Sequence, residues 1–160
     1  MTIHRLSDRP HMARATADLM TRIWPAHYGP GGGGHALADV FRRITEDRAA
    51  IAVQDGKVVG TVALADTSFG DTGEGPWLVG LCTDPTVRAR GFGTALASWA
   101  MGNARRAGHP ALYATTQDAA GIFARLGWTH LRTLTEGSGQ WTVWSCDLTG
   151  APVQDDPEDR

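Results

Sequence analysis

The segment from Trp77 to Ala107 constrains the fold most strongly, because it combines a buried strand, a glycine-rich loop and an amphipathic helix in direct succession. Residues Trp77 to Thr83 are apolar on both alternating faces, which is typical of a central strand covered on both sides. From Gly93 to Ala107, apolar side chains recur at helical spacing, and Gly108 follows where a left-handed cap is expected. The succession predicts a sheet with helices packed on its faces.

The remaining pattern completes this sheet. Asp55-Gly56 is the dipeptide that best fits a two-residue hairpin turn, so we expect paired strands at Ile51–Gln54 and Lys57–Ala65. The other expected strands are Ile3–Leu6, Ala111–Thr115, Thr129–Glu136 and Gln140–Asp147, and the other expected helices are Pro10–Trp24, Ala36–Thr45 and Asp118–Leu126. The order predicts an α/β (α+β) fold with a central mixed, mostly antiparallel sheet and helices on both faces.

The N-terminal part of the chain is expected to contain two helices with a proline between them. Pro25 is expected to end the first helix, because the residue before a proline is disfavoured in the helical conformation. The helix expected over residues 36–45 presents four apolar side chains to one side, namely Leu37, Val40, Phe41 and Ile44.

Length and composition limit the classes of protein. The 160 residues suit one domain over residues 1–149, followed by an acidic, disordered tail over 150–160. A formal net charge of -2 argues against nucleic-acid and anionic-membrane partners, and no apolar run approaches the ~18 residues of a membrane helix. Cys82 and Cys146 lack the spacing of a zinc site, so no metal is expected. The polar N-terminus predicts a cytoplasmic location.

The loop between the buried strand and the long helix has the features of an anion site. Gly91 and Gly93 remove side chains where a ligand would approach the backbone, and the first amides of the helix point outward. The helix dipole, Arg88, Arg90 and the Thr94 hydroxyl add positive or donating groups, which suits a pyrophosphate. The glycines fit neither a dinucleotide-binding fingerprint nor a nucleoside triphosphatase loop. A glycine-rich turn with two solvated arginines is the alternative.

In this loop and its flanking elements, the sequence resembles the Gcn5-related N-acetyltransferase superfamily. Its signature, Arg/Gln-x-x-Gly-x-Gly/Ala, is matched by Arg88, Gly91 and Gly93, and the likeness extends over about Pro76 to Leu131. The resemblance implies acetyl-CoA as cosubstrate, with the backbone of the buried strand pairing with the pantetheine arm. The residues implied to contact it are Leu81, Cys82, Thr83, Arg88, Ala89, Arg90, Gly91, Phe92, Gly93, Thr94, Thr116 and Phe123.

The resemblance also implies transfer of an acetyl group to a primary amine of a small molecule or peptide, by direct attack in a ternary complex. A non-catalytic acyl-CoA sensor is the alternative, and a transferase acting on aminoacyl-tRNA is disfavoured by the charge. A polycationic antibiotic as acceptor stays open, because Asp66, Asp71 and Glu74 cluster in one loop. A homodimer also stays open.

The catalytic residues are less clearly indicated. Many superfamily members carry a glutamate near the start of the equivalent strand, so Glu74 is the candidate base and Asp66 its alternative. The superfamily often places a tyrosine, as proton donor, four residues before the glycine that ends the later helix, where this chain has Phe123. Phenylalanine cannot donate a proton. Tyr28, Thr116 and Cys82 remain as donors, with Tyr113 a weaker option, or the thiolate leaves unaided.

The segment from Trp24 to Gly34 lies where superfamily members carry their variable acceptor loop. His27 is a candidate base because imidazole titrates near neutral pH. The rings of Trp24 and Tyr28 are expected to pack on an acceptor or to stack against its cation. An ordinary surface loop with core-facing aromatic side chains is the alternative.

Overall fold

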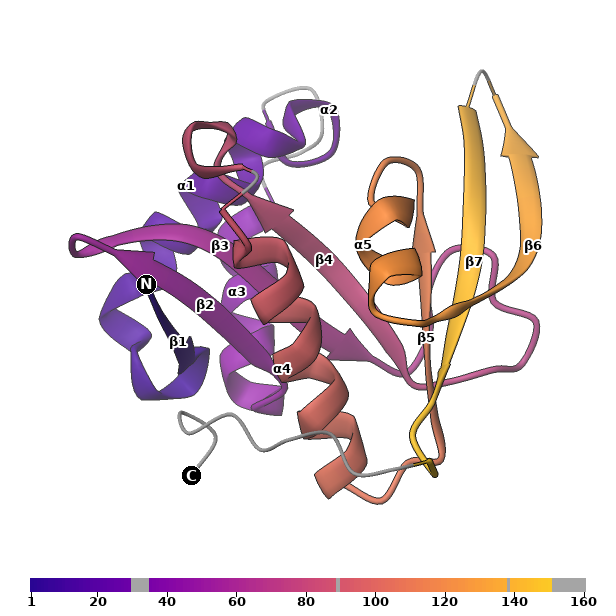
Figure 1. Cartoon of the computed structure of the whole chain (residues 1–160). Helices are drawn as coiled ribbons and strands as arrows, with labels where there is room; N and C mark the ends of the chain where they lie inside the picture. The colour runs from indigo at the N-terminus through magenta and orange to yellow at the C-terminus, as the bar shows by residue number, and fades with distance from the viewer. Residues whose placement is uncertain (30–34, 89, 138, 151–160) are drawn as a thin grey trace. The chain divides into compact units, whose positions relative to one another are not determined.

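The computed structural model of the chain describes residues 1–29, 35–88, 90–137 and 139–150. Within these residues, seven strands form a sheet in the order β1-β2-β3-β4-β5-β7-β6 (Figure 1). The β4–β5 pair is parallel, whereas the β1–β2, β2–β3, β5–β7 and β6–β7 pairs are antiparallel. The predicted mixed, mostly antiparallel sheet is therefore confirmed. The strands are β1 (Thr2–Arg5), β2 (Ala49–Gln54), β3 (Lys57–Ala65), β4 (Trp77–Thr83), β5 (Ala111–Thr116), β6 (Thr129–Glu136) and β7 (Gly139–Asp147).

The helices follow the predicted order, with short additions. Pro25 does follow the end of the first long helix, but it also begins a four-residue helix, where its missing N–H is harmless. None of the described helices combines the length and hydropathy needed to cross a membrane. The α-helices are α1 (Ala13–Ile23), α2 (Pro25–Tyr28), α3 (Ala36–Glu46), α4 (Phe92–Arg106) and α5 (Ala120–Arg125), and the short 3-10 helices are η1 (Leu6–Asp8), η2 (Pro10–Met12) and η4 (Pro85–Val87).

The β2–β3 hairpin turns at Asp55-Gly56, as predicted. Both residues have positive φ angles, 52° for Asp55 and 74° for Gly56, which is the geometry that matches the twist of two paired strands. The register shifts between Ala52 and Val53, so a bulge lies just before the turn. The dipeptide therefore fixes which residues of the two strands face each other.

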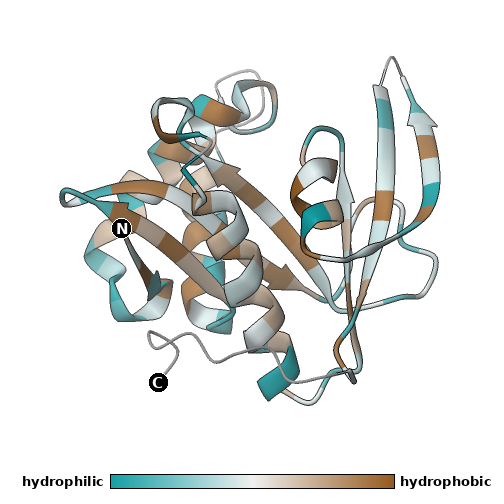
Figure 2. Cartoon of the chain, viewed as in Figure 1, coloured by the Kyte–Doolittle hydropathy of each residue, from teal (hydrophilic) through white to brown (hydrophobic). Residues whose placement is uncertain are grey.

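The chain forms two compact units that both draw on β4 and α4. The first unit comprises Met1–Ala63 and Gly80–Ala97. In this unit α1 and α3 lie on one face of the sheet and the first turns of α4 on the other (Figure 1). Hydrophobic residues run along β2 and β3 (Figure 2). Fully buried side chains of this unit include Leu6, Leu19, Met20, Val40, Ile51, Val62 and Leu96.

The second unit comprises Leu64–Val79 and Ser98–Arg160. Its sheet contains the beginning of β4, then β5, β7 and β6. Trp77, Leu112, Phe123 and Val143 are its fully buried large side chains among the described residues. The expectation of a single domain over residues 1–149 stays a prediction, and the tail beyond Gly150 lies outside the described residues.

The buried face of α3 differs from the predicted one. Phe41 was expected beside Val40, but its side chain is 54% exposed, whereas Arg43 is only 7% exposed. Ala36, Val40 and Arg43 follow one another at spacings of four and three residues, so they share a helix face and Phe41 lies outside it. The helix therefore buries a cation where the apolar pattern placed a phenyl ring.

Gly80, in β4, is expected to be intolerant of a side chain. Its φ is +62°, and a Cβ atom there would lie 3.1 Å from Cζ and 3.2 Å from Nη1 of Arg43. We expect Gly80→Ala to lower the free energy of unfolding by about 1–3 kcal/mol, measured by urea denaturation. Gly91→Ala is the matched control, because Gly91 has a φ of +85° but open space around its Cα. Equal losses of unfolding free energy in the two variants would show that the contact with Arg43 does not contribute to the cost at Gly80.

Candidate functional site

The loop that leads from β4 to α4 is fastened by Asp84. Its backbone amide donates to the Val59 carbonyl at 2.7 Å, and its Oδ1 accepts from the Thr86 amide at 2.9 Å and the Thr86 hydroxyl at 2.8 Å. The backbone hydrogen bond from Thr86 is the main reason that the pKa of Asp84 is lowered. Arg22 of α1 adds an ion pair at 3.4 Å. One carboxylate therefore fixes the start of the loop, up to Thr86.

Among the described residues, the first turn of α4 presents amides without a hydrogen-bond partner beside Gly91. The Ala95 amide donates to the Gly91 carbonyl at 3.0 Å, so the amides of Phe92, Gly93 and Thr94 have no acceptor within the helix. Gly91 has a positive φ of 85°, and a Cβ at this position would meet no atom within 4 Å. Open space over unpaired amides at a helix N-terminus suits an anionic group. Ala89, predicted in the same loop, lies outside the described residues.

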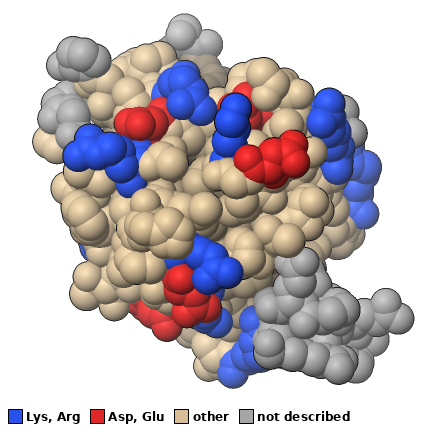
Figure 3. All heavy atoms as spheres, turned by 90° about the vertical axis from the view of Figure 1, so that its left-hand side faces the viewer, with Lys and Arg blue, Asp and Glu red and all other residues tan. Residues whose placement is uncertain are grey.

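Charges of both signs surround this loop. The side chains of Arg88 and Arg90 are exposed. A pocket of about 700 Å³ lies beside the loop, between α1 and the β2–β3 hairpin. Its basic residues are Arg22, Lys57 and Arg90, and its acidic residues are Asp18, Asp55 and Asp84. Figure 3 likewise shows basic and acidic side chains interspersed on one side of the molecule, so that side presents no broad patch of one sign.

The end of β4 carries three of the predicted cosubstrate contacts, Leu81, Cys82 and Thr83. The described ladder between β4 and β5 joins Trp77 to Tyr113 and Leu78 to Ala114, so these three residues follow the paired stretch. Cys82 is 6% exposed, and burial raises the pKa of its thiol to about 12. The thiol therefore stays protonated at neutral pH and is no nucleophile.

Tyr28 and His27 lie together in α2. Their rings meet edge to face with centroids 4.4 Å apart, and the Trp24 ring lies 6.2 Å from that of Tyr28. Tyr28 is 8% exposed, and burial is the main reason that its pKa is raised to about 12, so the hydroxyl keeps its proton at neutral pH. His27 is exposed. The glycines that follow, up to Gly34, lie mostly outside the described residues.

Arg43 of α3 is the residue of this region that sequence reasoning missed. Its guanidinium lies against Gly80 of β4, and its charge acts on Tyr28 and Cys82. Only the spacing from Ala36 and Val40 could have indicated that Arg43 is buried, because no motif includes it.

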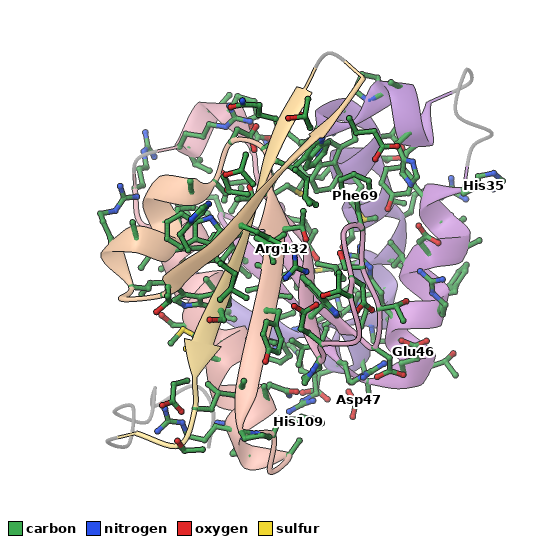
Figure 4. All side chains as sticks on the ribbon, turned by 90° about the vertical axis from the view of Figure 1, so that its right-hand side faces the viewer. His35, Glu46, Asp47, Phe69, His109 and Arg132 are labelled. Carbon is green, nitrogen blue, oxygen red and sulfur yellow. The ribbon has the colours of Figure 1, made fainter. Side chains whose placement is uncertain are left out.

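Glu74 is held by Arg132 of β6. The guanidinium donates from Nη1 to Oε2 at 2.6 Å and from Nη2 to Oε1 at 3.0 Å, and Nη2 also reaches the Gly70 carbonyl at 2.7 Å. Arg132 and Phe69 appear on the same side in Figure 4. The hydrogen bond from Arg132 is the main reason that the pKa of Glu74 falls to about 2. A carboxylate with this pKa is a weak proton acceptor, and the pair ties the β3–β4 loop to β6.

Thr116 and Phe123 have clear structural roles in the second unit. The Thr116 hydroxyl accepts a hydrogen bond from the Ala119 amide at 2.8 Å, just before α5. Phe123 is 2% exposed and packs on Trp128, with ring centroids 4.7 Å apart. Their contacts with a cosubstrate stay predictions.

The predicted site residues fall into two groups. The first unit contains His27, Tyr28, the end of β4 and the described residues of the glycine loop, whereas Glu74, Thr116 and Phe123 belong to the second unit. Asp66, the alternative base, is exposed directly after β3. Among the described residues, no three His, Cys, Asp or Glu side chains gather in a way that could hold a metal ion.

Comparisons with known proteins bear on the family and the fold. The family model described as the acetyltransferase (GNAT) family matches residues 15–128. A comparison with curated proteins gives no match.

Solved structures show the same fold. Aminoglycoside 6'-acetyltransferase type Ii is 20% identical, with a TM-score of 0.77 over 95% of this chain and 100% of that one. An aminoglycoside 6'-N-acetyltransferase complexed with coenzyme A is 16% identical, with a TM-score of 0.77 over 96% and 100%. The Salmonella typhimurium protein yncA with acetyl-CoA is 20% identical, with a TM-score of 0.68 over 97% and 98%. The predicted fold is thus confirmed.

The ion pair between Glu74 and Arg132 should make the free energy of unfolding depend on pH. Its pKa in the folded protein is about 2, below the ordinary 4.5, so its contribution is present above pH 4.5 and lost as the pH falls towards 2. We expect Glu74→Gln to lower the free energy of unfolding at pH 7 by about 1–3 kcal/mol and to flatten its decrease in acid. Glu136→Gln, at an exposed carboxylate of β6, is the control. The prediction would be contradicted if the free energy of unfolding of the wild type and of Glu74→Gln decreased in the same way as the pH falls.

Proposed function

The chain belongs to the acetyltransferase (GNAT) family, and on this premise we propose that it transfers an acetyl group from acetyl-CoA to a primary amine. The acceptor is a small molecule or a peptide, and the amine attacks directly in a ternary complex. The observation that carries the proposal is the first turn of α4, where unpaired amides lie beside the open space at Gly91.

Binding of the cosubstrate follows from this turn. The amides of Phe92, Gly93 and Thr94 hold the pyrophosphate, and each charge-assisted hydrogen bond contributes about 1.5–3 kcal/mol. Arg88 and Arg90 add positive charge from exposed positions. The backbone of Leu81 to Thr83 pairs with the pantetheine arm, so that the ligand adds a strand beyond the stretch of β4 that pairs with β5.

The transfer needs a neutral amine, a polarised carbonyl and a proton for the departing thiolate. A backbone amide near Leu81 or Cys82 polarises the thioester carbonyl. Tyr28 supplies the proton, because its hydroxyl is protonated at neutral pH and Phe123 cannot replace it. His27, exposed beside Tyr28, accepts the proton of the amine. Glu74 holds the β3–β4 loop through Arg132, and its role as a base stays a prediction.

The acceptor class is supported by two named structural neighbours, which are aminoglycoside acetyltransferases. These names favour a small amine over a protein substrate. The acidic loop is only partly free to bind a cation, since Glu74 pairs with Arg132 and Asp71 accepts a hydrogen bond from the Gly73 amide. A homodimer, a cytoplasmic location and the lack of metal, nucleic-acid and membrane partners stay predictions.

The binding proposal is tested with Gly91→Glu. A carboxylate placed over the amides of α4 should repel the pyrophosphate, so we expect the affinity for acetyl-CoA to fall at least a hundredfold in titration calorimetry. Gly137→Glu is the matched control, because Gly137 also combines a positive φ with open space, in the β6–β7 turn. Equal affinity in both variants would contradict the assignment of the site.

The transfer itself is tested by thiol release with a panel of amines. We expect at least one small primary amine to raise release from acetyl-CoA well above hydrolysis. If acetyl-CoA binds tightly but neither small amines, peptide N-termini nor lysine accelerate release, the chain is an acyl-CoA sensor and the transferase proposal is wrong.

The role of Tyr28 is tested by Tyr28→Phe, which removes only the hydroxyl. Loss of a general acid should lower kcat about 10²-fold or more while the KM for acetyl-CoA changes little. Tyr113→Phe tests the weaker candidate donor in the same assay, because Tyr113 is the other tyrosine of the chain, and it should leave kcat unchanged if Tyr28 is the donor. An unchanged kcat in Tyr28→Phe would show that the thiolate is protonated by another donor.

A further inference from the structure

Arg43 is a buried cation, and its burial is unfavourable in free energy. Only 7% of the residue is exposed, and its Nη1 has no hydrogen-bond partner among the described residues. The neighbouring carboxylate of Asp39 forms its ion pair with Arg42, at 3.2 Å. Burial of a guanidinium with an unsatisfied donor is unfavourable, and a well-packed apolar side chain would avoid that cost. A violation of this kind at a candidate site indicates that the charge is used.

The guanidinium lies directly against the strand that holds the proposed thioester. A Cβ atom on Gly80 would come within 3.1 Å of Cζ of Arg43, so the glycine provides the space that the cation occupies. Gly80 is followed by Leu81 and Cys82, whose backbone amides face the thioester carbonyl in the proposed function. The positive charge is therefore next to the stretch of β4 where negative charge would develop.

The titratable and charged groups that interact with Arg43 lie at the same place. They are Tyr28 of α2, Cys82 of β4, and Asp39 and Arg42 of α3. The charge of Arg43 lowers the pKa of Tyr28 and that of Cys82, although burial has the larger and opposite effect on both. A cation that favours a phenolate or a thiolate here will favour any other anion in the same position.

We infer that Arg43 is a positioning residue of the proposed transfer, whose buried charge stabilises the negative charge that develops on the thioester oxygen and then on the sulfur. The inference rests on the proposed function. In the reaction the amine nitrogen bonds to the acetyl carbon, the bond from that carbon to sulfur breaks, and the electron pair stays on sulfur. The nitrogen loses one proton and the sulfur gains one. Arg43 neither donates a proton nor touches the reacting atoms.

The inference is tested first on the product complex, without turnover. The pKa of the thiol of bound coenzyme A is measured from the ultraviolet absorbance of its thiolate, as the difference between complex and free protein. Replacement of Arg43 by Met should raise this pKa by about one unit, because a cation lowers the pKa of a neighbouring thiol. Arg43→Lys keeps the charge and should remain near the wild type. Arg42→Met, at an exposed arginine of the same helix, is the matched control.

Steady-state kinetics give the second readout. We expect Arg43→Met to lower kcat about 10–100-fold while the KM for acetyl-CoA changes less than about twofold, since the charge acts mainly on the transition state. Arg43→Lys should recover most of kcat. Arg43→Gln replaces Arg43→Met if the latter does not give a cooperative thermal transition.

Three outcomes separate the hypotheses. If the thiol pKa of bound coenzyme A is unchanged in folded Arg43→Met or Arg43→Gln, the inference is overturned while the transferase proposal stays intact. A loss of kcat that Arg43→Lys does not recover would also overturn it, because the role would then be packing. Failure of the wild-type protein to bind coenzyme A and acetyl-CoA would instead overturn the proposed function.

Discussion

The hydrogen bonds of Asp84 are the constraint on which the rest of the site depends. Its amide ties the end of β4 to Val59 of β3, and its carboxylate holds Thr86, so the chain leaves the sheet in one direction. The three amides at the start of α4 are useful to an anion only if this path is fixed, because a loose turn would lose conformational entropy on binding. The same residue thus links the sheet to the head of the helix.

Two charged arrangements, Glu74 with Arg132 and Arg43 against Gly80, have different explanations. Glu74 and Arg132 form two charge-assisted hydrogen bonds that fasten a loop and offset part of their cost, although Nε of Arg132 has no partner among the described residues. Arg43 has no acceptor for Nη1 among the described residues, and its burial costs free energy that the nearby charge of Asp39 offsets in part. The hydrogen bonds between Glu74 and Arg132 stabilise the β3–β4 loop. We attribute the second arrangement to the negative charge that the proposed transfer would develop beside Arg43.

Most of the fold could be predicted because its signals are local. The Asp55-Gly56 turn, the apolar run of β4 and the glycine after α4 each fix an element through its own residues, and the structure places all three as expected. The glycine loop was predictable for the same reason, since its amides, glycines and arginines are contiguous. Phe41 was placed wrongly because a list of apolar residues at roughly helical spacing does not decide which helix face is covered.

The candidate residues beyond the glycine loop were harder to predict because their properties come from partners far along the chain. Glu74 resembles a free carboxylate in sequence, but Arg132, 58 residues later, sets its pKa. Arg43 and Gly80 meet only after α3 packs on β4, and neither residue alone indicates the other. Sequence reasoning therefore identifies groups that act through their own backbone, such as the amides of α4. Groups whose properties depend on a neighbour's charge become visible only when the fold brings the two together, as it does for Glu74 and Arg132.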